Sequence, residues 1–112
     1  MSTAYLISSD KIGNQDPQLG QRLMHSFFMN LLTAAEKPAH ILFVERGVKL
    51  LLPEFSAFNA LKILQDEYHV ELLACITCLD YYGITDSITI GQISGMPEII
   101  AAMHESDKVI HL

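Results

Sequence analysis

The sequence predicts an α/β fold with three layers, α/β/α, built on a mainly parallel five-stranded sheet. Short apolar runs alternate with longer helical patterns from one end of the chain to the other. Strands connected by helices take right-handed crossovers, which make the strands parallel. The run HILFVE at 40–45 is almost continuously apolar, as expected for a strand covered on both faces. A chain of 112 residues fits one core, so 1–112 is expected to be a single domain.

The first part of the chain predicts a strand, a long helix and a second strand. Residues 3–9, TAYLISS, form the first strand. Asp16 followed by Pro17 is typical of a helix start, because the carboxylate accepts free N–H groups and proline has none to leave unpaired. This helix is expected to end before Pro38, and 40–45 is the second strand. Its apolar stripe consists of Leu19, Leu23, Phe27 and Leu31, widened by Met24, Phe28 and Leu32.

The second part predicts two further helix-and-strand units and a final strand. Gly47 marks a turn, and the segment VKLLL after it is ambiguous between a strand and a short buried loop. The order of the strands in the sheet does not follow from the pattern. The remaining elements are a helix at 54–68, a strand at 70–75, a short helix at 78–82 before Gly83, a weak strand at 87–91, a helix at 97–104 and a strand at 108–112.

Composition limits the kind of partner. Half of the residues are hydrophobic and only 18% are charged, which is low for a small domain, so part of the surface is expected to pack against other copies of the chain. The net charge is -6 and the seven basic residues are scattered, which disfavours nucleic acids and anionic membranes. The first residues do not resemble a signal peptide and no apolar run approaches a membrane span, so a cytoplasmic location is expected.

The only two cysteines lie close together. Cys75 ends the strand at 70–75 and therefore lies at the carboxyl edge of the sheet, where ligands collect in parallel α/β folds. The segment TCLD has the form of a capping box, with Thr77 as N-cap and Asp80 reaching back to it. Cys78 would then lie in the first helical turn, where N–H groups favour a thiolate and the Asp80 carboxylate opposes it. The two thiols are therefore the candidate reactive groups.

A second polar loop is expected at the same edge of the sheet. Ser9 and Asp10 follow the first strand, and we expect them to border the pocket of the cysteines, although a simple solvated turn explains them too. A structural disulfide is disfavoured in a reducing compartment. Zinc is disfavoured because only one close ligand pair is present, unless a site is shared between subunits. Cys75 could also be a simple buried apolar residue, an alternative that explains Cys78 less well because Cys78 lies in a turn.

Four segments carry a family resemblance that extends almost from end to end. They are LISSDKIGNQDPQLGQRLMHSFF, FVERGVKLLL, LLACITCLDYYGITD and SDKVIHL, and they resemble the DsrE/DsrF-like sulfur-relay family, in particular its YedF-like branch. The resemblance implies an α/β/α fold, assembly into trimers or hexamers, and a persulfide on a strand-end cysteine, for which Cys75 is the match. Cys78 matches an additional cysteine of that branch. Its members carry a TusA-like domain in front, which this sequence lacks, so a relay between two domains of one chain is not expected. A role in selenium metabolism is implied only weakly, and the sequence leaves open whether sulfur or selenium is carried.

The leading hypothesis is therefore a sulfur carrier or sulfurtransferase-like subunit that needs no cofactor or metal. Cys75 would hold the sulfur, Cys78 would resolve or hydrogen-bond it, and donor and acceptor proteins would be its partners. Two other classes remain open. A CxxC pair at a helix start is also used by thiol–disulfide redox proteins, although the order of elements differs from theirs. A non-catalytic oligomeric binding module with packed cysteines is the other.

Overall fold

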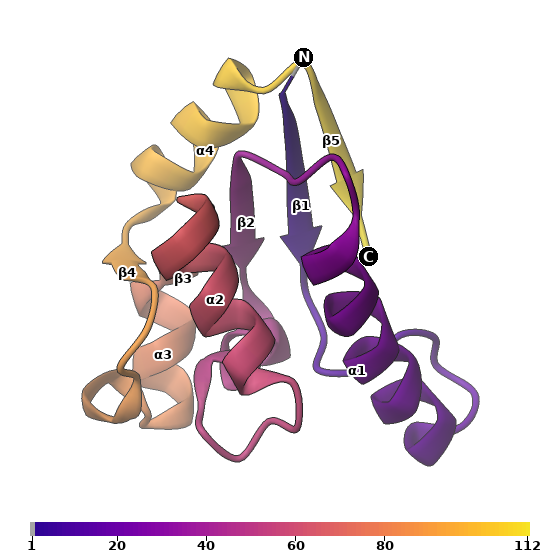
Figure 1. Cartoon of the computed structure of the whole chain (residues 1–112). Helices are drawn as coiled ribbons and strands as arrows, with labels where there is room; N and C mark the ends of the chain where they lie inside the picture. The colour runs from indigo at the N-terminus through magenta and orange to yellow at the C-terminus, as the bar shows by residue number, and fades with distance from the viewer. Residues whose placement is uncertain (1) are drawn as a thin grey trace.

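The computed structural model describes residues 2–112 and contains a parallel five-stranded sheet with helices on both faces (Figure 1). The strand order is β4-β3-β2-β1-β5, which puts the cysteine-bearing β3 inside the sheet. The strands are β1 (Thr3–Ile7), β2 (His40–Phe43), β3 (Glu71–Cys75), β4 (Gln92–Ser94) and β5 (Lys108–His111). The helices are α1 (Pro17–Thr33), α2 (Phe58–Tyr68), α3 (Ile76–Tyr82) and α4 (Met96–Glu105), with 3₁₀ turns η1 (Glu45–Leu51) and η2 (Thr85–Ser87).

The core is divided by the sheet. On one face, α1, α2 and α3 bury the larger apolar cluster, which includes Phe28, Phe43 and Leu61. On the other face, α4 covers a smaller cluster that includes Leu42 and Cys75. Alternate residues of each central strand feed these two clusters, as the period of two requires. The predicted three-layer α/β/α fold with a mainly parallel sheet is confirmed.

Helix α1 begins as predicted but turns a different face to the core. The Asp16 carboxylate accepts the N–H groups of Gln18 and Leu19, at 3.1 and 3.2 Å. The expected stripe is wrong at its start, because Leu19 and Leu23 are 54% and 43% exposed. A Cβ on Gly20 would lie 2.9 Å from the Ile12 carbonyl oxygen, so this glycine lets α1 approach the preceding loop closely. The buried residues are Gly20, Met24, Phe28 and Leu31.

The helix also ends earlier than expected. It stops at Thr33, and the chain then crosses to the sheet, where the Ala39 N–H donates to the Thr3 carbonyl oxygen at 2.9 Å just before β2. The first strand likewise stops at Ile7, not at residue 9.

The segment after β2 is a 3₁₀ helix, which the sequence did not predict. The strand stops at Phe43 and the ambiguous VKLLL lies mostly within η1. A Cβ on Gly47 would lie 2.2 Å from the Ile7 carbonyl oxygen, so the turn is pressed against the end of β1. Helix α2 then starts at Phe58, later than expected, because tight turns precede it, with the Phe58 N–H donating to the Phe55 carbonyl oxygen.

The predicted fourth strand at 87–91 is wrong, because β4 comprises Gln92–Ser94. Gly91 has φ +82, which an extended strand does not allow, and its N–H donates to Gln65 Oε1 at 2.6 Å. Ile90, just before it, is buried in the larger cluster and anchors the loop. The last helix and strand, α4 and β5, lie within two residues of their predicted positions.

Candidate functional site

The two cysteines lie at the carboxyl end of β3 in different surroundings. Cys75 is the last residue of the strand, pairs in register with Ser94 and is only 3% exposed. It belongs to the small apolar cluster beneath α4. Cys78 lies in the first turn of α3, is half-buried and packs against both clusters. Both are free thiols.

The expected capping box is absent, because the strand passes directly into the helix. Helix α3 begins at Ile76 with Cys75 in the N-cap position, and no side chain caps it. Thr77 therefore lies inside the first turn and is exposed. The Asp80 carboxylate accepts a hydrogen bond from the Thr85 hydroxyl at 2.5 Å, which connects α3 to η2. Gly83, with φ +68, ends the helix as predicted.

A backbone N–H points at the Cys78 sulfur. The Glu45 N–H donates to Cys78 Sγ at 3.1 Å, from the first residue of η1. Burial raises the pKa of the Cys78 thiol, the Glu45 N–H lowers it, and the neighbouring Cys75 thiol raises it again. The result is a pKa above the ordinary value, so burial outweighs the backbone donor. The Cys78 thiol is therefore a weaker acid than an ordinary cysteine, and the Glu45 N–H is the contact that favours its thiolate.

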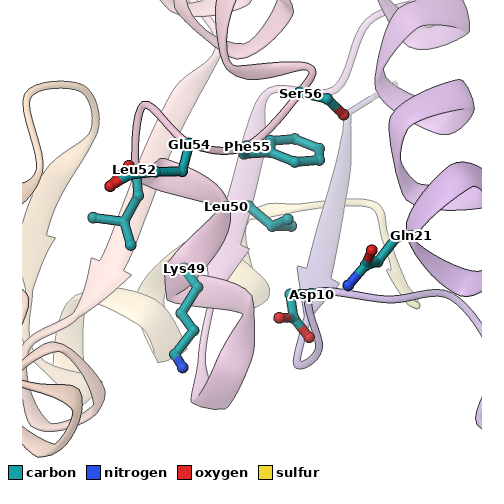
Figure 2. A pocket seen from close by; sticks show the side chains of 8 residues that line it. All are labelled: Asp10, Gln21, Lys49, Leu50, Leu52, Glu54, Phe55 and Ser56. Carbon is teal, nitrogen blue, oxygen red and sulfur yellow. The ribbon is translucent and has the colours of Figure 1, made fainter. Parts of the chain in front are cut away.

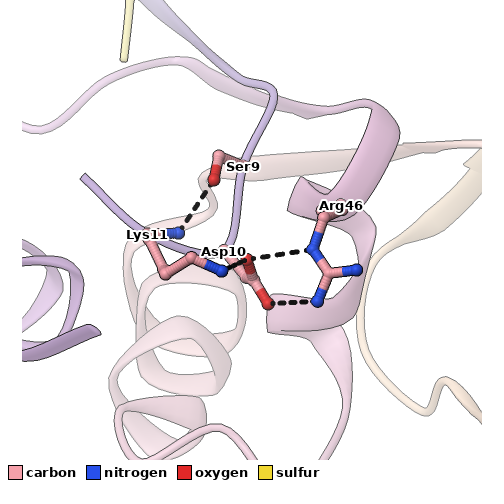
Figure 3. Close-up of polar contacts among 4 residues, drawn as sticks. All are labelled: Ser9, Asp10, Lys11 and Arg46. Atoms are coloured by element: carbon pink, nitrogen blue, oxygen red, sulfur yellow. Dashed lines mark hydrogen bonds and ion pairs between the residues drawn. The ribbon is translucent and has the colours of Figure 1, made fainter. Parts of the chain in front are cut away.

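The loop after β1 reaches this site through η1. Asp10 accepts hydrogen bonds from Arg46 Nε and Nη2 at 3.3 and 3.2 Å, and from Lys11 Nζ at 3.3 Å (Figure 3). Burial alone would raise the pKa of Asp10, but the hydrogen bonds and charges of Arg46 and Lys11 hold it below its ordinary value. Ser9 accepts the Lys11 backbone N–H at 3.1 Å and so shapes the turn. Asp10 thus contacts the residue next to Glu45.

Of the six residues proposed from sequence, the structure brings Cys75 and Cys78 together. Asp10 is connected to them indirectly, and within residues 2–112 no hydrogen bond from Ser9, Thr77 or Asp80 reaches a thiol. Sequence reasoning missed Glu45 and Arg46. The turn marked by Gly47 directly after an apolar strand was the available signal, since it placed these residues at the same edge of the sheet.

A cavity of about 360 Å³ lies between the loop after β1, η1 and the segment before α2, and neither cysteine lines it (Figure 2). Asp10 and Gln21 line one side, while Phe55 and Ser56 close another. Lys49 lines it as well, and its ammonium lies 4.7 Å from the centre of the Tyr82 ring on α3. The cavity therefore borders η1, and Lys49 connects its wall to α3.

No group of three or more metal-ligating side chains within residues 2–112 is placed to hold a metal ion. In that same range, no helix has both the length and the apolar character needed to cross a membrane.

The sequence and the fold can be compared with known proteins. The family model of the DsrE/DsrF-like family matches residues 1–112. The chain belongs to this family. Among solved structures, the YchN protein from E. coli is similar, with a TM-score of 0.66, 17% sequence identity and full coverage of both chains. At that identity the likeness supports the shared fold of this DsrE/DsrF-like protein. No curated protein sequence matches it.

Proposed function

We propose that this DsrE/DsrF-like protein is a sulfur carrier, sulfurtransferase-like in its chemistry, that holds sulfane sulfur as a persulfide and passes it to a partner protein. One observation carries the proposal: two free thiols are adjacent at the carboxyl end of a central strand, and the more exposed one accepts a backbone N–H. Membership of a family associated with sulfur relay supports it. Serving as a carrier requires a reachable sulfur and a donor for its charge.

The geometry favours Cys78 as the carrier thiol, the reverse of the order expected from sequence. Cys75 is 3% exposed and lies under α4, whereas Cys78 is half-buried and can meet a donor. The Cys78 thiolate attacks the outer sulfur of a donor persulfide, R–S–SH. A new S–S bond forms on Cys78, the donor's S–S bond breaks, and the donor leaves as its thiol after taking up a proton.

The stored sulfur can leave by two routes. An acceptor thiolate can attack the outer sulfur and regenerate the Cys78 thiolate. Alternatively, the Cys75 thiolate can attack the inner sulfur, releasing hydrosulfide and leaving a Cys75–Cys78 disulfide, which a thiol reductant must then reduce. The closeness of the two thiols, evident from the effect of Cys75 on the pKa of Cys78, supports the second route.

Exposed apolar side chains support assembly of the carrier into a homo-oligomer, for which a trimer or hexamer is proposed. Helix α4 exposes Met96 and Ile100, at 49% and 42%. The edge strand β5 exposes Val109, at 40%. Val109 is in register with Ala4, which is buried beneath α4, so its side chain lies on the same face of the sheet as α4. The α4 side of the sheet therefore carries exposed apolar side chains, as expected for a surface that packs against another copy of the chain.

The direct test is intact-mass spectrometry of the reduced protein after incubation with a cysteine desulfurase and cysteine. The wild-type chain should gain one sulfur atom that a thiol reductant removes. Cys78→Ser should abolish the gain, and Cys75→Ser, the matched control, should retain it. Absence of any gain, with both thiols free, would contradict the carrier function.

A thiol–disulfide redox module is the second candidate, and the adjacent thiols favour it. Its signature would be a Cys75–Cys78 disulfide with a reduction potential in the range of known oxidoreductases, about -270 to -120 mV. A non-catalytic binding module would instead show slow alkylation that does not discriminate between the two thiols.

A further inference from the structure

The backbone of Glu45 has an unusual conformation at the point where it meets Cys78. Its φ is 48°, in the left-handed region that residues other than glycine seldom adopt. Val44 before it is extended, with φ -132° and ψ 165°, so the chain reverses at Glu45. The Glu45 N–H, which follows the extended Val44, donates to Cys78 Sγ at 3.1 Å, and the positive φ turns the chain after it into η1. Strained residues of this kind persist where the surrounding structure holds them.

One set of contacts fixes this turn to the end of β1. The Val44 N–H donates to the Ile7 carbonyl oxygen at 3.0 Å, and the Gly47 N–H donates to the Val44 carbonyl oxygen at 2.9 Å. Gly47 lies so close to Ile7 that a Cβ would be 2.2 Å from its oxygen. These backbone contacts fix the two residues on either side of the Glu45–Arg46 pair.

The side chain of Arg46 provides the second attachment. Its guanidinium binds both carboxylate oxygens of Asp10, on the loop after β1 (Figure 3). A two-point contact between planar groups fixes orientation as well as distance. Asp10 is 36 residues from Arg46 in sequence, so the pair connects two separate loops at the edge of the sheet.

We infer that Asp10 and Arg46 are positioning residues for Cys78: their ion pair holds η1 so that the Glu45 N–H stays on the sulfur. The inference rests on the proposed function, since it assigns these residues to the carrier thiol. The N–H stabilises the negative charge on Cys78 Sγ before it attacks a donor, and again when the sulfur is passed on. Neither Asp10 nor Arg46 needs to touch the sulfur.

The sign of one mutational effect separates this role from simple charge effects. If Asp10 acted only through its charge, removing that charge would lower the pKa of Cys78, because an anion near a thiol disfavours the thiolate. Loss of positioning would instead raise the pKa of Cys78, because the thiolate would lose the hydrogen bond from the Glu45 N–H. Arg46→Gln is less informative alone, since both explanations predict a higher pKa.

The experiment measures the rate of Cys78 alkylation by iodoacetamide against pH, in a Cys75→Ser background. Asp10→Ala is expected to move the midpoint up by about 0.5–1 pH unit and to slow alkylation at pH 7 by about three- to tenfold. Arg46→Gln should do the same and Arg46→Lys should restore part of the rate. Lys11→Gln removes the other cation bound to Asp10. Lys11 lies on the same loop as Asp10 and does not connect it to η1, so this variant should shift the midpoint less than Arg46→Gln does. Lys62→Gln, in an exposed pair with Asp66 on α2, should leave the midpoint unchanged.

An unchanged or lowered midpoint in Asp10→Ala would overturn the inference. If that variant does not fold, as judged by circular dichroism, Asp10→Asn replaces it, because one oxygen still accepts from Arg46 and a smaller upward shift is expected. A downward shift in Asp10→Asn would overturn the inference equally. No sulfur donor is used, so failure of the carrier function would appear in the mass measurement and failure of positioning would appear here.

Discussion

Cys75 and Cys78 are three positions apart, and their surroundings differ in almost every respect. Cys75 closes a strand, is 3% exposed and lies in the apolar cluster under α4. Cys78 lies in a helix, is half-buried and accepts the Glu45 N–H from a separate element. A CxxC spacing alone makes the two thiols look equivalent. The fold separates them into one protected thiol and one that is partly accessible, and on this difference rests our proposal that Cys78 carries the sulfur.

The largest expected effect is on native-state reactivity. Cys78 should react with iodoacetamide about 100-fold faster than Cys75, because Cys75 reacts only when α4 or the strand end opens locally. Time-resolved peptide mass spectrometry measures both rates in the wild-type chain. In denaturant, where burial is lost, the two rates should become similar. Equal rates in the native protein would contradict the difference in accessibility between Cys75 and Cys78.

The turn that supplies the donor should be sensitive to added volume at Gly47. Gly47→Ala places a Cβ 2.2 Å from the Ile7 carbonyl oxygen and is expected to lower the free energy of unfolding by about 2 kcal/mol. Gly83→Ala is the control: φ is +68°, but nothing lies within 4 Å of the new atom, so a loss of about 1 kcal/mol is expected. Urea denaturation measures both. A smaller loss at Gly47 than at Gly83 would show that the turn is not pressed against β1.

At Glu45, relief of backbone strain should raise the free energy of unfolding, in contrast to the loss expected at Gly47. Glu45→Gly keeps the N–H and removes the side chain from a φ of 48°, so a gain of about 0.5–1 kcal/mol in unfolding free energy is expected. The pKa of Cys78 should fall slightly, because the Glu45 carboxylate is one of the groups that raise it. His69→Gly is the matched control, since His69 has φ 57° at the end of α2. It should give a similar gain in stability and no change in the pKa of Cys78.

These effects bear on how far sequence reasoning could go. The alternation of apolar runs and the Asp16-Pro17 start depend on neighbours in sequence, and they identified the fold and the start of α1. The buried face of α1 depends on the approach of Gly20 to the loop at Ile12. The place of β4 depends on a hydrogen bond between Gly91 and Gln65, 26 residues apart. Local patterns do not contain contacts of this kind.

The candidate site shows the same limit. The positions of Cys75 and Cys78 at the edge of the sheet followed from the end of an apolar strand. The residue that contacts the Cys78 sulfur, Glu45, comes from a different loop, 33 positions away. Its left-handed backbone has no signature in a glutamate, since glycine is the residue usually found there. The proposed division of roles between the thiols therefore required three-dimensional contacts.

The smallest expected effect concerns acid stability. The pKa of Asp10 is lowered in the folded chain, so its ion pair contributes stability above the unfolded-state pKa of about 3.9, and this is lost as pH falls through the lower folded value. Asp10→Asn is expected to cost about 0.5 kcal/mol at pH 7, because the pair is partly solvated. The free energies of unfolding of wild type and variant, measured by urea denaturation, should converge as the pH falls below about 4. A difference of the same size at pH 7 and at pH 3 would mean that the loss does not come from the carboxylate charge.

The most direct test of the central claim is to locate the sulfur in the wild-type chain. The protein is loaded by a cysteine desulfurase with cysteine, blocked with iodoacetamide and digested, and the modified thiols are identified by tandem mass spectrometry. The extra sulfur is predicted on Cys78, with Cys75 unmodified until the protein is denatured. Extra sulfur on Cys75, with Cys78 recovered as an ordinary alkylated thiol, would contradict the assignment and restore the order of roles first expected from the sequence.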